Sequence, residues 1–461
     1  MTAQVTANIL DQHQSALVLG LGVTGYSAVR YLHKQGVDIT VMDTRAEPPQ
    51  KADLEQRFPQ ARTFFGGIDH DLLAKHSLVV ISPGLDLKAP ELAAARKHGA
   101  EFVGDIELFL QVNQKPVIAI TGSNGKSTVT ALVGRMCEHA GLSTLVAGNI
   151  GYPALDALTD NVPYDVAVLE LSSFQLETIT RVSAISATIL NISPDHMDRY
   201  ASMGDYVLAK ARILRGAKQV VLPRHQDSLA QITKVADTVT FGTDAPRTEK
   251  DFGVEKIKQS QWLVHGKQRL VKQKNIPLLG RHNIENVLAA FALVNELGLD
   301  KKKITAVAKS FTGLPHRMEI VASADGVTWV NDSKATNVGA TVTALKSLDQ
   351  DVILIAGGQG KSADFSALQD AISPTLKQVV LVGQDAQLIA DALSGLVPIL
   401  RADDMAAAVA KAGKRASQNT VVLLSPACAS FDMYENFEQR GDHFCELVQA
   451  WISQNKREGQ R

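Results

Sequence analysis

Short runs of apolar residues, each long enough for one buried strand, recur along the chain and are separated by stretches of helical length. They lie at residues 16–19, 39–42, 78–81, 117–120, 166–169, 187–190, 220–222, 327–330, 352–355, 379–382 and 420–424. Continuous apolar strands that alternate with helices are typical of parallel sheets covered on both faces. In such folds, ligands bind beyond the carboxyl ends of the strands. We therefore predict an α/β protein whose functional residues directly follow its strands.

The length of 461 residues predicts about three domains, because a single core stops growing near ~250 residues. One polar seam ends at Pro116, and a second follows the segment 310–315. We place the domains at residues 1–108, 109–313 and 314–461. Short alternating strands at 238–241 and 261–264, in a region rich in Gln and Lys, predict an antiparallel addition to the middle domain.

The charge and the cysteines exclude several classes of protein. A formal net charge of −1 gives no overall attraction to nucleic acid or to an anionic membrane. No apolar run approaches the ~20 residues of a membrane span, and the polar N-terminus does not resemble a signal peptide. Cys137, Cys428 and Cys445 form no Cys-x-x-Cys pair, which favours free thiols over disulfides or a zinc site. These features predict a cytoplasmic protein that binds no nucleic acid, and we expect a monomer.

A glycine-rich turn follows the apolar run at 117–120 and precedes a helical pattern over residues 128–139. It consists of Gly122, Ser123, Asn124, Gly125, Lys126, Ser127 and Thr128. Backbone N–H groups of such a turn, together with the helix N-terminus, bind phosphate; the lysine reaches the outer phosphates, and the serine hydroxyl binds Mg²⁺. The alternative is an ordinary turn with a surface lysine. The strand–turn–helix context favours a nucleoside triphosphate site.

A second glycine pattern, Gly20-Leu-Gly22-Val-Thr-Gly25, lies between the first strand and the first helix, and Asp43 ends the next strand. This pattern is typical of dinucleotide-binding folds. It leaves open whether the ligand is NAD or another pyrophosphate compound, and a tight turn without a ligand is a third interpretation. Ser82 and Gly84 follow the third strand and face the same crevice. We favour a nucleotide-diphosphate ligand, because nothing else in the chain suggests redox chemistry.

Three residues of the middle domain are candidates for metal chemistry. Glu170 ends a strand that we expect beside the phosphate loop, where a Mg²⁺ ligand is needed. His196 follows another strand and could bind a second cation, although a single histidine is as often structural. Lys210 lies on an amphipathic helix, where the alternative is a solvated or phosphate-contacting lysine.

Polar clusters follow three strands of the C-terminal domain, at residues 331–337, 357–362 and 425–431. The middle cluster is again Gly-x-x-Gly-Lys-Ser, so the chain contains two candidate phosphate loops. The first has Glu170 and His196 as neighbours, whereas lysines and hydroxyls surround the second. We therefore assign ATP to the first loop and a carboxylate-bearing molecule to the second.

In combination, these motifs resemble those of the Mur ligases. The resemblance rests on residues 121–127, 170–177, 195–199, 282–286 and 314–317, and it extends in order over nearly the whole chain. Residues 331–337, 424–430 and 436–441 narrow it to the branch that adds D-glutamate to UDP-N-acetylmuramoyl-L-alanine in peptidoglycan synthesis. The resemblance implies Rossmann-like first and third domains around a central parallel sheet of the P-loop ATPase type.

The same resemblance implies a role for each site residue. The UDP-sugar would be held by Thr24, Asp43, Thr44, Arg45, Ser82, Gly84 and Asn149. Two Mg²⁺ ions would be held by Ser127, Glu170, His196 and Lys210, with Lys210 carbamylated. The adenosine and γ-phosphate of ATP would be surrounded by Asn283, His316, Arg317 and Asp332. The D-glutamate site would be lined by Lys334, Thr336, Lys361, Ser430 and Phe431. Catalysis would depend on Lys126, His196, Lys210, Arg317 and Lys334.

The implied reaction is ATP-dependent formation of an amide bond through an acyl phosphate. Two rival functions remain at this stage. A redox enzyme would bind NAD(P)H through residues 20–43. A nucleotide-gated interaction protein would hydrolyse ATP slowly and without regard to amino acids.

Overall fold

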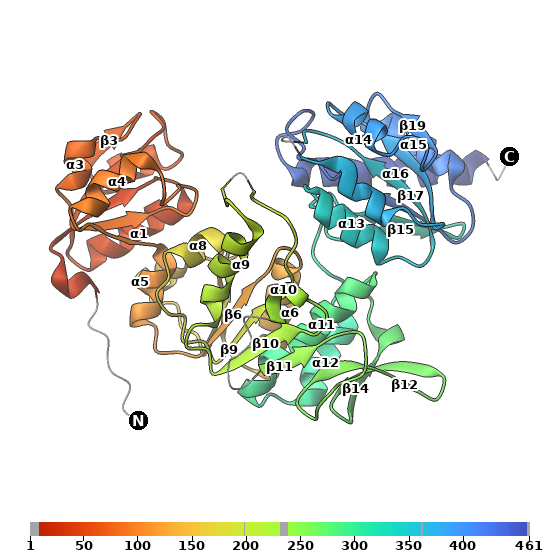
Figure 1. Ribbon diagram of the computed structural model, residues 1–461, viewed down its shortest axis with the longest axis horizontal. Coiled ribbons are helices and arrows are strands. Elements are labelled where there is room, and N and C mark those ends of the chain that lie inside the picture. The colour runs from red at the N-terminus through yellow and green to blue at the C-terminus, as the bar shows by residue number, and fades with distance from the viewer. Residues whose placement is uncertain (1–8, 198, 231–237, 361–362, 459–461) are drawn as a thin grey trace.

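The computed structural model describes residues 9–197, 199–230, 238–360 and 363–458. In this part of the chain three separate sheets follow one another, each flanked by helices (Figure 1). The three-domain α/β fold predicted from the sequence is confirmed. The boundaries at 108/109 and 313/314 stay a prediction, and helix α5 (Asp105–Val112) runs across the first of them.

The N-terminal sheet has five parallel strands in the order β3-β2-β1-β4-β5, which is a doubly wound, Rossmann-like arrangement. Its strands are β1 Ser15–Leu19, β2 Asp38–Asp43, β3 Arg62–Phe65, β4 Leu78–Ile81 and β5 Glu101–Val103. Its helices are η1 Ile9–Gln12, α1 Val23–Lys34, α2 Lys51–Arg57, α3 His70–Ala74, α4 Pro90–Lys97 and α5 Asp105–Val112.

The central sheet has nine strands in the order β14-β13-β12-β11-β10-β9-β6-β8-β7. The strands are β6 Val117–Thr121, β7 Thr144–Gly148, β8 Val166–Glu170, β9 Ser186–Ile189, β10 Gln219–Pro223, β11 Thr238–Phe241, β12 Phe252–Ile257, β13 Ser260–His265 and β14 Gln268–Lys272. The helices are α6 Lys126–Ala140, α7 Ala154–Thr159, α8 Ser173–Glu177, α9 Met203–Ala211, η2 Arg212–Leu214, α10 Asp227–Ala230, η3 Gln273–Asn275, α11 Arg281–Val294, η4 Asn295–Leu297 and α12 Lys301–Ser310. Strands β12 to β14 form the predicted antiparallel addition, whereas β11 pairs parallel with β10.

The C-terminal sheet has six strands in the order β15-β16-β20-β17-β18-β19, and only the β15–β16 pair is antiparallel. The strands are β15 Glu319–Ala324, β16 Val327–Asn331, β17 Asp351–Ala356, β18 Leu376–Leu381, β19 Ile399–Arg401 and β20 Thr420–Leu424. The helices are α13 Val338–Lys346, η5 Phe365–Ala371, α14 Ala386–Ala392, α15 Met405–Arg415 and α16 Phe437–Glu458.

The N-terminal and central domains share one hydrophobic core. A single cluster of buried side chains contains Val18 and Leu32 of the first domain together with Leu155 and Leu169 of the second, and Phe109 of α5 belongs to it as well. The buried side chains of the C-terminal sheet belong to clusters of their own. The first two domains are therefore packed together, while the third is packed mainly on itself.

Contacts of two charged side chains of α1 also join the first two domains. The Arg30 guanidinium donates to Asp156 and Asp160, at 2.6 Å in each case. The Lys34 ammonium donates to the carbonyl oxygens of Leu158 and Thr159 at the end of α7. Helices α1 and α7 are thus tied to each other.

Candidate active site

The glycine-rich turn predicted to bind phosphate connects β6 to α6 and has the backbone of a phosphate loop. Gly122 has φ +155°, and Gly125, the residue before α6, is left-handed with φ +81°. A Cβ atom on Gly125 would lie 2.6 Å from Oδ1 of Asn286, so only glycine fits. The first N–H groups of a helix have no partners within it, and here they face the turn together with the positive end of the helix dipole. This turn is built to hold an anion.

Two lysines converge on one carbonyl oxygen of this loop. The ammonium groups of Lys126 and Lys210 donate to the Gly122 oxygen at 2.8 and 3.0 Å. Burial lowers the pKa of Lys126, and burial together with the charge of Lys126 holds the pKa of Lys210 well below its usual range. Lys210 is only 2% exposed, so the alternative of a solvated surface lysine is wrong.

Glu170 stands at the end of β8, the neighbour of β6 in the sheet, as predicted. It is 1% exposed. Its Oε1 accepts a hydrogen bond from Asn149 Nδ2 at 2.8 Å, whereas its Oε2 is buried with no partner in the part of the chain that the structure describes. An unpaired buried carboxylate oxygen is costly unless a cation or a donor joins it. This oxygen is the strongest sign of a cation site in the structure.

His196 lies in the loop after β9, with a left-handed backbone (φ +56°). Its ring packs edge-on against Phe174, and its Nε2 lies 3.6 Å from a carboxylate oxygen of Asp195. Asp195 belongs to the motif at 195–199 but was given no role of its own in the sequence analysis, and its charge raises the pKa of Lys126 and of Lys210 against the effect of burial. The predicted metal residues thus belong to one electrostatic neighbourhood.

A cavity of about 80 Å³ lies where the C-terminal domain meets this loop. Asn124, Gly125, Thr128, Asn283, Asn286, Arg317, Asp332 and Lys334 are among the residues that line it. Arg317 Nη2 donates to Ser127 Oγ across the domain joint at 2.9 Å. The cavity thus brings together residues from two domains that the sequence analysis placed around ATP.

Asp332 and Lys334 are ionisable groups at this joint, of which Asp332 is buried and Lys334 is half-buried. Burial raises the pKa of Asp332 to about 7, although its two oxygens accept hydrogen bonds from Ser425 Oγ and the Met318 N–H. Burial and the charge of Arg317 lower the pKa of Lys334, whose ammonium lies 3.8 Å from the centre of the Phe437 ring. Lys334 therefore lies with the residues predicted for the nucleotide.

His316 is arranged differently from its predicted neighbours. Its Nδ1 is hydrogen-bonded to Asn331 Nδ2 at 3.0 Å, and its ring packs edge-on against Phe437. A Cβ atom on Gly441 would lie 2.2 Å from this nitrogen. His316 does not line the 80 Å³ cavity, and its observed contacts are with the C-terminal domain.

The second Gly-x-x-Gly-Lys-Ser segment is not a second phosphate cradle of the same kind. Three of its N–H groups are already bonded: Gly357 to Pro426 O, Gln359 to Ala429 O, and Gly360 to the Asp385 carboxylate. The first helical element after it is a 3₁₀ helix, η5, that starts at Phe365. The two loops therefore differ in structure although their sequence pattern is the same, and the assignment of a carboxylate-bearing molecule to the second stays a prediction. Lys361 lies outside the described residues.

In the N-terminal domain, Asp43 supports the glycine-rich loop from within. It is 2% exposed; its carboxylate accepts from the Leu21 N–H at 2.6 Å and from Arg45 Nε and Nη2 at 2.9 and 2.7 Å. Burial alone would raise the pKa of Asp43, but the hydrogen bonds from Arg45 and Leu21 outweigh it and lower the pKa. Both oxygens are therefore engaged within the protein, and Arg45 is the exposed member of the pair.

The remaining predicted residues lie at the ends of strands as expected. Ser82 Oγ donates to Gly20 O at 2.9 Å and so joins the two N-terminal loops. Thr24 is the second residue of α1, and Thr44 and Gly84 follow β2 and β4. In the C-terminal domain, Ser430 is buried, Phe431 is 60% exposed and Thr336 is half-buried.

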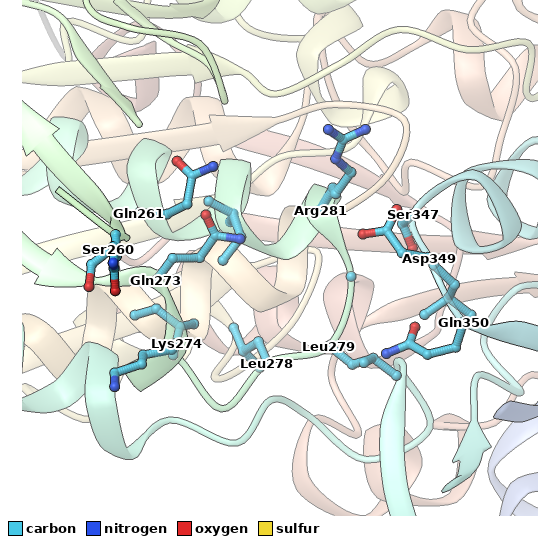
Figure 2. Close-up of a pocket in the computed structure, with 15 residues that line it drawn as sticks. Ser260, Gln261, Gln273, Lys274, Leu278, Leu279, Arg281, Ser347, Asp349 and Gln350 are labelled. Carbon is cyan, nitrogen blue, oxygen red and sulfur yellow. The ribbon is translucent and has the colours of Figure 1, made fainter. Parts of the chain in front are cut away.

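A larger cavity, of about 430 Å³, opens at the joint between α11 and the C-terminal domain. Figure 2 shows Gln261 and Gln273 on one side of it and Ser347, Asp349 and Gln350 on the other. The Arg281 N–H donates to Ser347 O beside it at 3.2 Å. None of the predicted site residues that the structure describes lines this cavity. Both polar and apolar side chains line it.

The donor set suits Mg²⁺ bound together with phosphate. Within the described residues, no three His, Cys, Asp or Glu side chains stand close enough to hold a metal by themselves. Mg²⁺ binds through one or two carboxylates plus phosphate oxygens and water, and the unpaired Glu170 oxygen, on the strand beside the phosphate loop, supplies such a carboxylate. No helix in the described chain is long and apolar enough to cross a membrane.

The parallel sheets, the phosphate loop and the acid on the neighbouring strand define a three-domain α/β protein of the P-loop nucleotide-binding class. Three family models match the chain: the Mur ligase MurD-like N-terminal domain over residues 14–104, the Mur ligase middle domain over 120–294, and the Mur ligase glutamate ligase domain over 316–428. The chain belongs to the Mur ligase family, as its motifs predicted.

The relatives agree in length and in name. Similar proteins called UDP-N-acetylmuramoylalanine–D-glutamate ligase occur in Nitrosococcus oceani (45% identity, covering 95% of this chain and 97% of the relative) and in Methylobacillus flagellatus (46%, covering 94% and 96%). Among solved structures, the fold resembles that of MurF ligase from Thermotoga maritima in complex with ADP, with a TM-score of 0.58, 15% identity and coverage of 99% and 100%. It also resembles UDP-N-acetylmuramate-alanine ligase MurC from the same organism, with a TM-score of 0.57, 20% identity and coverage of 95% and 100%.

Proposed function

We propose that this chain is an ATP-dependent ligase that joins D-glutamate to UDP-N-acetylmuramoyl-L-alanine in the cytoplasmic part of peptidoglycan synthesis. The observation that carries the proposal is that Arg317 donates to Ser127 of the phosphate loop and interacts electrostatically with Glu170, whose Oε2 is unpaired on the neighbouring strand. The relatives of similar length that bear this enzyme's name supply the substrates.

The reaction needs two steps at one site, the transfer of a phosphoryl group and then the formation of an amide bond. A carboxylate oxygen of the UDP-linked substrate attacks the γ-phosphorus of ATP, and ADP leaves, which yields an acyl phosphate. The amine of D-glutamate then attacks the acyl carbon and loses a proton, and inorganic phosphate leaves with the C–O bond electrons. Such chemistry depends on positioning and charge neutralisation and needs no covalent protein nucleophile.

The residues of the loop suit the first transfer. The α6 N-terminus and Lys126 would hold the β- and γ-phosphates, and Arg317 would approach them from the C-terminal domain. Asn283 and Asp332 line the same cavity and would contact the nucleoside. Mg²⁺, which Ser127 and Glu170 would hold, would neutralise the charge of the transferred phosphoryl group.

A second cation would require an anionic ligand on Lys210, because an ammonium group cannot bind a metal. We infer that CO₂ adds to the neutral Lys210 amine with release of a proton, giving a carbamate that binds this cation together with His196. The burial of Lys210 and the nearby ammonium of Lys126 favour the neutral amine that this addition needs.

The UDP-sugar and D-glutamate would be held by different domains. Thr24, Thr44, Arg45, Ser82, Gly84 and Asn149 would hold the UDP-sugar, while Thr336, Lys361, Ser430 and Phe431 would hold D-glutamate. We infer that the C-terminal domain closes when nucleotide and UDP-substrate are bound, excluding water that would hydrolyse the acyl phosphate. The cavity of about 430 Å³ at the joint (Figure 2) leaves space for such a movement. Small-angle scattering that detected no compaction with both ligands would contradict closure.

The proposal is tested by measuring phosphate release from ATP and Mg²⁺ with UDP-N-acetylmuramoyl-L-alanine and a panel of amino acids. Release should require both co-substrates and should occur with D-glutamate but not with L-glutamate. Activity with the L-isomer alone would overturn the assignment. Slow hydrolysis indifferent to amino acids would favour the nucleotide-gated interaction protein, and a saturable NAD(P)H fluorescence titration would favour the redox enzyme.

A further inference from the structure

Arg199 is a buried arginine in the loop between β9 and α9, three residues after His196. Its side chain is 11% exposed, and it makes contacts with both the N-terminal and the central domain. Arg199 belongs to the motif at residues 195–199, but the sequence predicts no role for it. Its contacts connect segments that carry proposed site residues of two domains.

On the side of the N-terminal domain, Arg199 binds the loop that follows β4. Its Nη1 donates to Pro83 O at 3.3 Å and its Nη2 donates to Leu85 O at 3.0 Å. The Nε lies 3.9 Å from a carboxylate oxygen of Asp86. Ser82 of this loop donates to Gly20 O, so the loop that Arg199 contacts is itself bonded to the glycine-rich loop.

On the side of the central domain, Arg199 binds helix α8, which follows Glu170. Its Nη2 donates to Glu177 Oε2 at 2.9 Å, and its guanidinium carbon lies 4.2 Å from the centre of the Phe174 ring. The same Phe174 ring contacts the imidazole of His196. Arg199 therefore contacts α8 and Phe174, which adjoin the proposed metal residues Glu170 and His196, and it also contacts the loop after β4 that is proposed to hold the diphosphate.

The buried Nε of Arg199 has no hydrogen-bond partner among the described residues. Leaving such a group unsatisfied costs stability, so packing alone does not account for an arginine here. A planar guanidinium with five donors in a fixed fork fits acceptors that come from separate segments, whereas an ammonium is a single point charge. The chemistry of the side chain matches a role in fixing geometry.

We propose that Arg199 is a positioning residue that fixes the distance between the loop holding the UDP-substrate's diphosphate and the centre where its carboxylate meets the γ-phosphate. The inference rests on the proposed function, because the two ends of the substrate are then held by different domains. A shift of about 1 Å between them costs about a hundredfold in rate, while each domain keeps its own ligand contacts.

The test compares Arg199→Ala and Arg199→Lys with Arg30→Ala. Arg30 also joins the N-terminal domain to the central domain, but it bonds to Asp156 and Asp160 at α7 rather than to the loops that Arg199 contacts. For Arg199→Ala, we expect kcat to fall between about tenfold and a hundredfold while the KM for ATP stays unchanged. Arg199→Lys should recover part of this loss, since an ammonium reaches only one or two of the acceptors. Arg30→Ala should lower the melting temperature and leave kcat near the wild-type value.

Two outcomes would overturn the proposal: an unchanged kcat in Arg199→Ala, or the same kinetic loss in Arg30→Ala. If Arg199→Ala does not fold, an unchanged kcat in Arg199→Lys would also overturn it. Hydrogen exchange provides a readout independent of activity, because only the Arg199 variants should speed exchange in both residues 82–86 and 191–197. A wild-type protein that releases no phosphate with D-glutamate would contradict the proposed function, and the exchange result would then still decide whether Arg199 couples the two loops.

Discussion

Asp105 allows a quantitative test of how burial affects the stability of this protein. It is the first residue of α5, and its side chain is 5% exposed with Oδ1 lacking any partner in the described chain. Burial raises its pKa from 3.8 to about 6, against the effect of the N–H groups of Ile106 and of Asp105 itself. The folded protein therefore holds a proton that the unfolded chain releases.

The sign and size of the effect follow from linkage. Between pH 4 and pH 6 the folded state binds more protons than the unfolded state, so stability falls as the pH rises and levels off above pH 6. A shift of 2.2 pKa units, from 3.8 to 6, corresponds to about 3 kcal/mol. Asp105→Asn, which keeps the shape without the charge, should remove this dependence.

Urea unfolding of the wild type and of Asp105→Asn, measured from pH 4 to pH 7.5, provides the test. The variant should match the wild type near pH 4 and exceed it by up to about 3 kcal/mol at pH 7.5. Asp71→Asn, at an exposed acid in the first turn of α3, serves as control and should show no such trend. A difference between wild type and Asp105→Asn that is constant with pH would refute the reasoning.

Three further predictions concern lysines of the proposed site and two glycines. Lys126→Ala should abolish acyl-phosphate formation, measured by hydroxylamine trapping, whereas Lys361→Ala should mainly raise the KM for D-glutamate; reversed results would mean that the loops are assigned the wrong way round. Lys210→Ala should be nearly inactive and regain activity with added acetate, and full activity without acetate would exclude a metal-site role. Gly357→Ala should lower the free energy of unfolding by about 3 kcal/mol, because its φ is +120° and its Cβ would lie 1.9 Å from a carbonyl oxygen. Gly395→Ala, also at positive φ but with open space around it, should cost only about 1 kcal/mol, and an equal loss in both would show that φ alone decides.

The buried parallel strands could be predicted from the sequence because each is apolar throughout. The strands that escaped prediction have partly exposed side chains, as in β3 (Arg62–Phe65), or alternate in burial, as in β7 (Thr144–Gly148). Such strands lack the continuous apolar run on which the prediction depended. Their positions are set by pairing with neighbours, which a local pattern does not contain.

The difference between local patterns and contacts of distant segments also explains which parts of the site could be predicted from the sequence. The loop at Gly122 and the position of Glu170 follow from local sequence and strand order. The cavity partner Asn286 and the role of Arg199 depend on contacts between distant segments. The segment at Gly357 repeats the letters of a phosphate loop, but its N–H groups bond to residues 385, 426 and 429, which no local reading would reveal.

The core shared by the first two domains makes them one folding unit. Three sheets divide the chain by topology, but Val18 and Leu169 belong to one buried cluster, so the first two sheets should unfold in a single cooperative transition. The C-terminal sheet has separate clusters and is free to unfold by itself. In evolutionary and engineering terms, the C-terminal domain is the part that can be exchanged, whereas a cut between the first two domains would expose the interior of both.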